Sequence, residues 1–349
     1  MSGLPPSIGY PELVAGVMMV ALTAYALMAG ADFGGGVWDL MARGPRIDAQ
    51  RTLIASAIGP IWEANHVWLI IVVVMFFTGF PAAFATLSVV LHIPLTLMLA
   101  GIVLRGSAFV FRSYGRERHA QRRWGRVFAI ASIVTPVLLG IVIGAIASGD
   151  VGRAAQGIPV TGQASSVSFT ELYIAPWLAP FPLAVGGMAL ALFAYLAAVY
   201  LILATDDESL RDDFRARALA AAGAVFVAAF VALLVAHREA PEMGRGLIES
   251  PLAQAFQVVT GIAAMTAIWA LWTRRYQLAR IAAAGQVSLV LWGWAFVQFP
   301  LLIPPLGSIT ALAAPTATLR LLLIALGCGS VILVPSLVYL FRTFARART

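Results

Sequence analysis

The sequence contains no lysine and a single cysteine, and only 11% of its residues are charged. A soluble globular domain carries charge on about a quarter of its residues, so the composition excludes that class of protein. One cysteine, Cys328, excludes a disulfide within the chain and a cysteine-based metal site. Every basic residue is an arginine, and most lie in short segments between apolar runs. The formal net charge of +7 therefore does not indicate a nucleic-acid-binding surface.

Long apolar runs dominate the chain instead. Apolar residues make up 61% of the sequence, and the mean hydropathy is +0.90. A transmembrane helix needs about 20 predominantly apolar residues. The sequence therefore predicts an all-α polytopic membrane protein with nine transmembrane helices. We place these helices near residues 10–30, 54–77, 81–104, 126–147, 179–203, 217–236, 254–273, 281–300 and 319–341.

The segments between the runs are too short to build a soluble domain. The longest are residues 105–125, which are basic and aromatic, and residues 148–178, which are rich in Gly, Ser and Thr. We therefore expect residues 1–349 to form a single membrane domain. Its predicted organisation is two four-helix bundles plus one peripheral helix. The first bundle would comprise residues 1–150, the second 175–300, and the ninth helix 318–342.

The arginines are distributed unevenly across the predicted membrane. Most follow the first, third, fifth and seventh runs or lie in the C-terminal tail, among them Arg105 and Arg112. The positive-inside rule then predicts an N-terminus outside and a C-terminus in the cytoplasm. No basic segment precedes the first run, so we expect it to be a retained span in a bacterial plasma (inner) membrane. The four arginines on the opposite side are Arg153, Arg238, Arg245 and Arg320.

Ionisable residues inside the predicted spans are confined mainly to the first three. Each costs about 2.5–3.5 kcal/mol when it is ionised at a helix centre, so such groups face a protein interior or a wet cavity and suggest function. We therefore place any chemistry or ion traffic in the first bundle. The residues concerned are Asp32, Asp39, Glu63, His66 and His92.

Helical rise predicts a polar path through these residues. Asp32 lies roughly 16 Å and Glu63 roughly 18 Å from the cytoplasmic edge, at 1.5 Å per residue. Asp39 would lie about 6 Å inside that edge, on nearly the same face as Asp32. A carboxyl group in a low dielectric can be neutral and still exchange protons. Asp39, Asp32 and Glu63, with His66 on the same helix face as Glu63, are therefore candidates for a proton path. His92 would lie near the membrane midplane.

Structural roles remain open for the same residues. Glu63 could be a protonated residue that holds helices together, and the glycines around Asp32 indicate close backbone packing there. Asp39 lies near the interface and could pair with Arg43 or a neighbour.

The remaining polar and aromatic residues favour structural roles. The histidines His66 and His92 fit a packed core better than a metal site. Asn65 points away from Glu63 and could hydrogen-bond between helices. Trp62 fits a packing or interface role. We therefore expect no metal bound by this chain.

The sequence also lacks two signatures of channels and transporters. It has no selectivity-filter loop, and it has no pair of interrupted helices in matching halves. A stand-alone proton-coupled membrane transporter nevertheless stays an alternative, because it would use the same acidic residues. A scaffold without any role for these charges is a second alternative.

Two motifs belong to the first and second predicted helices: Gly30-Ala31-Asp32-Phe33-Gly34-Gly35-Gly36 and Gly59-Pro60-Ile61-Trp62-Glu63-Ala64-Asn65-His66-Val67-Trp68-Leu69. They resemble subunit II of cytochrome bd-type quinol oxidases. The Trp-Glu-Ala-Asn-His variant of the second motif is closer to the cyanide-insensitive branch of that family. Further similarities follow the third and eighth runs, at Arg105-Gly106 and at Phe299-Pro300.

The resemblance implies a subunit that binds no cofactor itself. Its partner would be the haem-bearing subunit I, which carries haems b and d, or b in place of d. The complex would oxidise ubiquinol or menaquinol and reduce O₂ to water with cytoplasmic protons, generating a proton-motive force. Small single-span accessory subunits, membrane lipids and quinone would be further partners. Glu63 and Asp32 match the family's acidic residues on helices 2 and 1, which are proposed to lead protons towards the partner's haem.

Overall fold

The computed structural model describes residues 8–59, 62–115, 118–158 and 167–346. Most of the described residues form helices, and one short pair of antiparallel strands is also present. Some features used above lie outside the described residues: Pro60, Ile61 and parts of the 105–125 and 148–178 segments.

Nine helices within the described ranges are long and apolar enough to cross a membrane, so this prediction is confirmed. Most correspond to single elements. They are α1 (Tyr10–Leu40), α3 with α4 (Trp62–Asn65 and Val67–Gly79), α6 (His92–Tyr114), α7 (Arg118–Ala147), α10 (Pro180–Ile202), α11 (Glu208–Glu239), α13 (Pro251–Trp272), α14 (Tyr276–Gln298) and α15 (Thr316–Arg346).

Shorter elements join the long helices. They are α2 (Ile47–Ile58), α5 (Pro81–Val90), α8 (Asp150–Gln156), α9 (Phe169–Tyr173), α12 (Pro241–Glu249), β1 (Leu301–Ile303) and β2 (Gly307–Ser308).

The predicted bounds of the second and third spans are wrong. The second apolar run divides, because α2 ends at Ile58 and the span itself covers Trp62–Gly79. In the third run, α5 ends at Val90 and the spanning helix covers His92–Ser113. The sequence placed this span about ten residues too early, because Arg105 resembled the first residue of a cytoplasmic loop.

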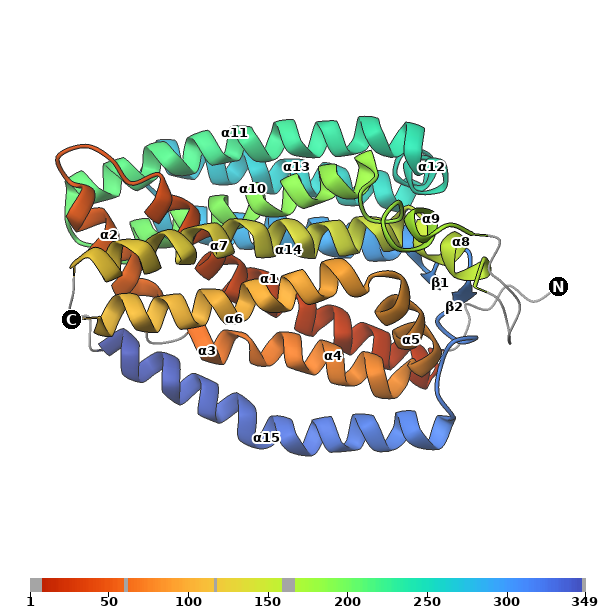
Figure 1. The fold of residues 1–349 in the computed structure, drawn as a ribbon. Coiled ribbons are helices and arrows are strands. Elements are labelled where there is room, and N and C mark those ends of the chain that lie inside the picture. The colour runs from red at the N-terminus through yellow and green to blue at the C-terminus, as the bar shows by residue number, and fades with distance from the viewer. Residues whose placement is uncertain (1–7, 60–61, 116–117, 159–166, 347–349) are drawn as a thin grey trace.

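The long helices run side by side, with α1 and α10 near the middle of the bundle (Figure 1). Helix α15 lies on the outside, contains Pro335, and contacts α4 and α1. Helix α2 lies at one end of the bundle, together with the last turns of α1 and α6; we call this the α2 end. Helices α5, α8, α9 and α12 and the two strands lie at the other end, the α5 end.

Glycines allow α1 to approach α10 closely. A methyl group at Gly34 would overlap the carbonyl oxygen of Phe193 on α10, and one at Gly30 would overlap the Phe193 ring. The indole nitrogen of Trp38 donates a 2.7 Å hydrogen bond to the carbonyl oxygen of Ala194. One buried core thus includes residues of α1 and α7 as well as α10, α11 and α14. The division into two four-helix bundles stays a prediction.

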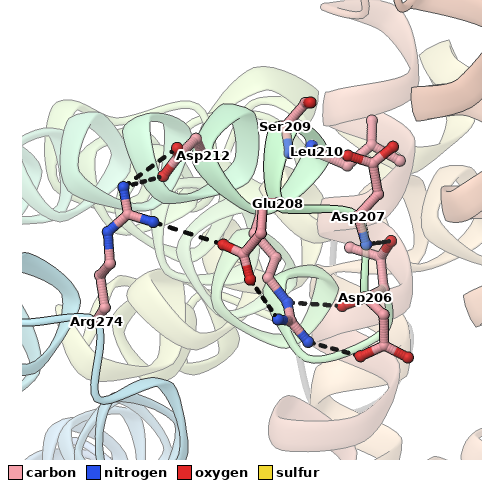
Figure 2. A network of polar contacts seen from close by, with 9 residues as sticks. Asp206, Asp207, Glu208, Ser209, Leu210, Asp212 and Arg274 are labelled. Atoms are coloured by element: carbon pink, nitrogen blue, oxygen red, sulfur yellow. Dashed lines mark hydrogen bonds and ion pairs between the residues drawn. The ribbon is translucent and has the colours of Figure 1, made fainter.

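A network of ion pairs holds three connections together at the α2 end. Arg211 contacts the side chains of Asp206 and Glu208 and the carbonyl oxygen of Thr205. Arg274, in the turn after α13, reaches Glu208 and Asp212 (Figure 2). On the neighbouring connection, Arg46 binds Asp213 with two hydrogen bonds. The start of α11 is therefore attached to the loops after α1 and α13.

Candidate functional site

Asp32 lies in the protein interior, where Asn65 binds it. Its side chain comes from the glycine-rich part of α1 and is 6% exposed. The side-chain amide of Asn65, on α3, donates a 2.7 Å hydrogen bond to Oδ2 of Asp32. Asn65 is 1% exposed. A buried polar contact of this kind joins the first and second spans in the way the sequence predicted for Asn65.

Arg105 supplies a buried positive charge beside Asp32. It is 2% exposed, lies within α6, and interacts electrostatically with Asp32. Its guanidinium is over the ring of Phe33 at 4.7 Å and over that of Phe128 at 5.3 Å, and its Nε donates to Ser132. The placement of Arg105 in a cytoplasmic loop is therefore wrong.

Asp39 forms an ion pair in the interior, closer to the α2 end than Asp32. Arg112 donates two hydrogen bonds to its carboxylate, of 2.8 and 2.9 Å, and the Nε of Arg51 lies 4.0 Å away. Paired bonds of this type are stronger and more directional than a single contact. Asp39 is 4% exposed. The prediction of a pair with a neighbouring arginine is confirmed in kind, but the partner is Arg112 rather than Arg43.

The two acidic residues and the two arginines share one spacing on parallel helices. Asp32 and Asp39 are seven residues apart on α1, and Arg105 and Arg112 are seven residues apart on α6. Both helices run from the α5 end to the α2 end (Figure 1). Arg112 is hydrogen-bonded to Asp39, whereas Arg105 interacts with Asp32 electrostatically, without a direct hydrogen bond. We call Asp39 with Arg112 the outer rung and Asp32 with Arg105 the inner rung.

Glu63 points away from this interior. It is exposed on α3, two residues before the buried Asn65. Together with Trp62 it lines a hollow of about 420 Å³ against α6. A Cβ atom at Gly106 would overlap the Trp62 ring, so only glycine allows this close approach of α3 and α6. The sequence placed Glu63 roughly 18 Å inside its span, whereas Glu63 lies in the first turn of the span Trp62–Gly79 with its side chain exposed.

His66 packs among aromatic rings. It lies between α3 and α4, with its Nδ1 3.5 Å from the Tyr25 hydroxyl and its ring near Phe33 and Trp62. We expected it on the same helix face as Glu63, but α3 ends at Asn65, so His66 is half-buried while Glu63 is exposed.

His92 lies at the α5 end rather than at the predicted midplane. It is the first residue of α6, its Nδ1 is 2.9 Å from the carbonyl oxygen of Val89, and its ring meets Tyr173 of α9 edge-on. Among the residues that the structure describes, no group of three His, Cys, Asp or Glu side chains is placed to hold a metal ion.

The comparison with known proteins gives the family. The family model for cytochrome bd terminal oxidase subunit II matches residues 10–344. The chain belongs to this family. The resemblance noted in the two motifs is therefore confirmed over nearly the whole chain.

Individual relatives agree with this assignment. The cytochrome bd ubiquinol oxidase subunit 2 of Bacillus subtilis is 26% identical over 240 residues, which cover 68% of this chain and 66% of that protein. The cytochrome bd-I ubiquinol oxidase subunit 2 of Escherichia coli is 27% identical over 200 residues, which cover 56% of this chain and 48% of that protein. The matched region thus spans about half to two thirds of each relative's length.

The fold also agrees with a solved structure. A chain of the bd oxidase from Geobacillus thermodenitrificans superimposes with a TM-score of 0.78, covering 96% of this chain and 98% of that chain at 20% sequence identity. At that identity the similarity establishes the fold alone. The roles of individual side chains must be argued from their own contacts.

Proposed function

We propose that this chain is the non-haem subunit II of a bd-type terminal quinol oxidase in a bacterial plasma membrane. It would pair with and stabilise a haem-bearing subunit I, whose haems b and d, or b in place of d, would oxidise quinol and reduce O₂ to water. Membership of the subunit II family supports this proposal, as do the names of the relatives in B. subtilis and E. coli. The N-terminus would be periplasmic and the C-terminus cytoplasmic.

The observation that carries the proposal is the buried inner rung. A carboxylate at this depth is stabilised by the amide of Asn65 and by the nearby cation of Arg105, so Asp32 can be ionised in the interior and take up a proton there. The outer rung lies between Asp32 and the α2 end. With the proposed orientation, this end faces the cytoplasm. Asp39 and Asp32 would therefore form the entry of a proton path into the complex.

The exposed Glu63 supports a partner on the face formed by α3 and α6. An ionisable side chain directed at lipid is expensive, so a membrane protein covers it with protein or water. Subunit I would cover this face, and Glu63 would then pass protons on to the partner. His66 is the remaining candidate for the proton path. It is half-buried and lies near Tyr25 and Trp62. Asn65, Trp62 and His92 would have structural roles.

The test is a purification through a tag on this chain in a mild detergent. We expect a second large subunit, haem bands in the reduced-minus-oxidised spectrum, and quinol-driven oxygen uptake. A colourless preparation in which this chain is stable without a second large subunit would contradict the oxidase proposal. It would favour the stand-alone proton-coupled transporter.

Variants of the purified complex then test the path. Asp32→Asn and Glu63→Gln should each lower oxygen uptake by about tenfold or more, as expected for loss of a positioned proton-transfer group, with the haem bands unchanged. If both variants take up oxygen at the wild-type rate, then this chain acts only as a scaffold within the complex.

A further inference from the structure

The ring of Phe128 lies between the two arginines of the rungs. Its centroid is 5.3 Å from the guanidinium carbon of Arg105 and 5.8 Å from that of Arg112. Phe128 belongs to α7, which packs along α6, and is 2% exposed. One aromatic side chain thus contacts the arginine of the inner rung and the arginine of the outer rung.

Helix geometry places the two arginines on different levels of α6. Residues seven apart on a helix are separated by about 10.5 Å along its axis. The guanidinium groups of Arg105 and Arg112 nevertheless both contact the ring of Phe128. The ring is therefore a contact that the inner rung and the outer rung share.

Protein atoms fill the space around the ring. The ring of Phe109 lies 5.9 Å away, and Ser132, one helical turn further along α7, is fully buried against Arg105. A methyl group at Gly36 of α1 would overlap Ser132 and touch Phe128. The ring therefore lies in a packed region between α1, α6 and α7, and an apolar side chain in this place offers no hydrogen bond to a chain of water.

We propose that Phe128 is a positioning residue that limits proton exchange between the α2 end and Asp32. This inference rests on the proposed function of the inner rung. The proton would move from a hydronium ion at the outer rung to a carboxylate oxygen of Asp32, leaving a water molecule behind and a neutral carboxylic acid. Displacement of the ring would let water connect the two rungs. Packing of the ring against both guanidinium groups would hold it in place between proton transfers, so that water does not connect the two rungs.

The experiment measures access past the ring directly. In the full-length chain, purified with whatever subunits accompany it, Cys328→Ser removes the native thiol and Ser132→Cys places one beyond Phe128. Silver ion, a small thiol-reactive cation, is added for increasing times, and unreacted thiol is then counted with a fluorescent maleimide after denaturation. Phe128→Leu should speed the silver reaction at least about tenfold, a barrier lower by about 1.4 kcal/mol. Phe128→Trp should not speed it.

Phe109→Leu is the matched control. Phe109 packs against Phe128 and Trp62 in the same cluster, so its loss removes the same volume without opening the gap between the rungs. Equal silver rates in the Ser132→Cys parent and in its Phe128→Leu variant, or the same acceleration from Phe109→Leu, would overturn the proposal. A fast reaction already in the Ser132→Cys parent would overturn it as well.

The proposed function fails in a different way. If Asp32→Asn leaves oxygen uptake unchanged while Phe128→Leu still opens the site to silver, then the seal exists but the inner rung carries no protons for the oxidase. If Asp32→Asn impairs uptake and silver access is insensitive to Phe128, then only the role of the ring is wrong.

Discussion

The amide nitrogen of Asn65 lies 2.7 Å from Oδ2 of Asp32 and links the second span to the first inside the membrane domain. Asn65 is the only asparagine in the chain. Two groups compensate the buried carboxylate of Asp32, this amide and the guanidinium of Arg105, and they come from different helices. The stability of the first three spans and the chemistry proposed for Asp32 therefore depend on the same contacts.

Asn65→Leu should destabilise the complex. The substitution removes the donor and leaves a carboxylate oxygen of Asp32 buried without a partner, which costs about 1–3 kcal/mol. The midpoint of thermal unfolding in detergent would measure the loss. Restoring the midpoint with the double variant Asp32→Leu/Asn65→Leu would confirm that the unpaired oxygen is responsible. If Asn65→Leu unfolds like the wild type, the hydrogen bond contributes nothing to stability.

Breaking the outer rung should cost more than breaking a surface pair. Arg112→Gln leaves Asp39, which is 4% exposed, without its two charge-assisted hydrogen bonds, and the expected loss is about 3 kcal/mol. The matched control is Arg46→Gln, which breaks the more exposed pair with Asp213 and should destabilise the protein clearly less, because solvent screens a surface pair. Unfolding of both variants by a denaturing detergent would measure the difference. Equal losses would place the outer rung among ordinary surface pairs.

Close packing of α1 on α10 makes Gly34 intolerant of a side chain. Gly34→Ala would place a methyl group on the backbone carbonyl of Phe193, which cannot move as a flexible side chain can. We expect a loss of about 1–3 kcal/mol or failure to assemble. Gly16→Ala on the same helix meets no atom within 4 Å and should be neutral or slightly stabilising. Yield of folded protein and thermal midpoints of the two variants would decide.

The first turn of α11 should depend on pH through Asp207. Hydrogen bonds from the backbone nitrogens of Ser209 and Leu210 lower the pKa of Asp207 below its ordinary value. A lowered pKa in the folded state means that this cap stabilises the protein above the unfolded pKa and loses its effect as the pH falls through the folded value. Wild type should therefore exceed Asp207→Asn in thermal midpoint near neutral pH, and the gap should narrow in acid below about pH 4.

Asp206→Asn is the control for this experiment, because it removes a neighbouring exposed charge without touching the cap. A gap between wild type and Asp207→Asn that stays constant from neutral pH into acid would show that the cap is not the pH-dependent element.

The sequence predicted the number and approximate position of the spans because long apolar runs report membrane helices directly. It misplaced the third span because Arg105 is charged. The sequence alone does not distinguish an arginine that is buried between two aromatic rings near a carboxylate from an arginine in a loop. The seven-residue spacing shared by Asp32 and Asp39 with Arg105 and Arg112 could have indicated the pairing, since it matches two helical turns on parallel helices.

Side-chain direction was the other limit of sequence reasoning. Asn65 and Glu63 differ by two residues, and helix periodicity alone indicates only that they point apart. Which of them faces the interior depends on the close approach of Trp62 to Gly106, a contact between residues far apart in the chain. His92 was misplaced for a related reason, because the end of α5 at Val90 interrupts a run that is uniformly apolar in sequence.

Helix α3 has only four residues, and it holds Glu63 on the surface and Asn65 against Asp32. A rigid turn of helix cannot rotate one of these side chains without moving the other. A partner protein that displaced this turn through Glu63 would therefore also change the length of the Asn65–Asp32 hydrogen bond.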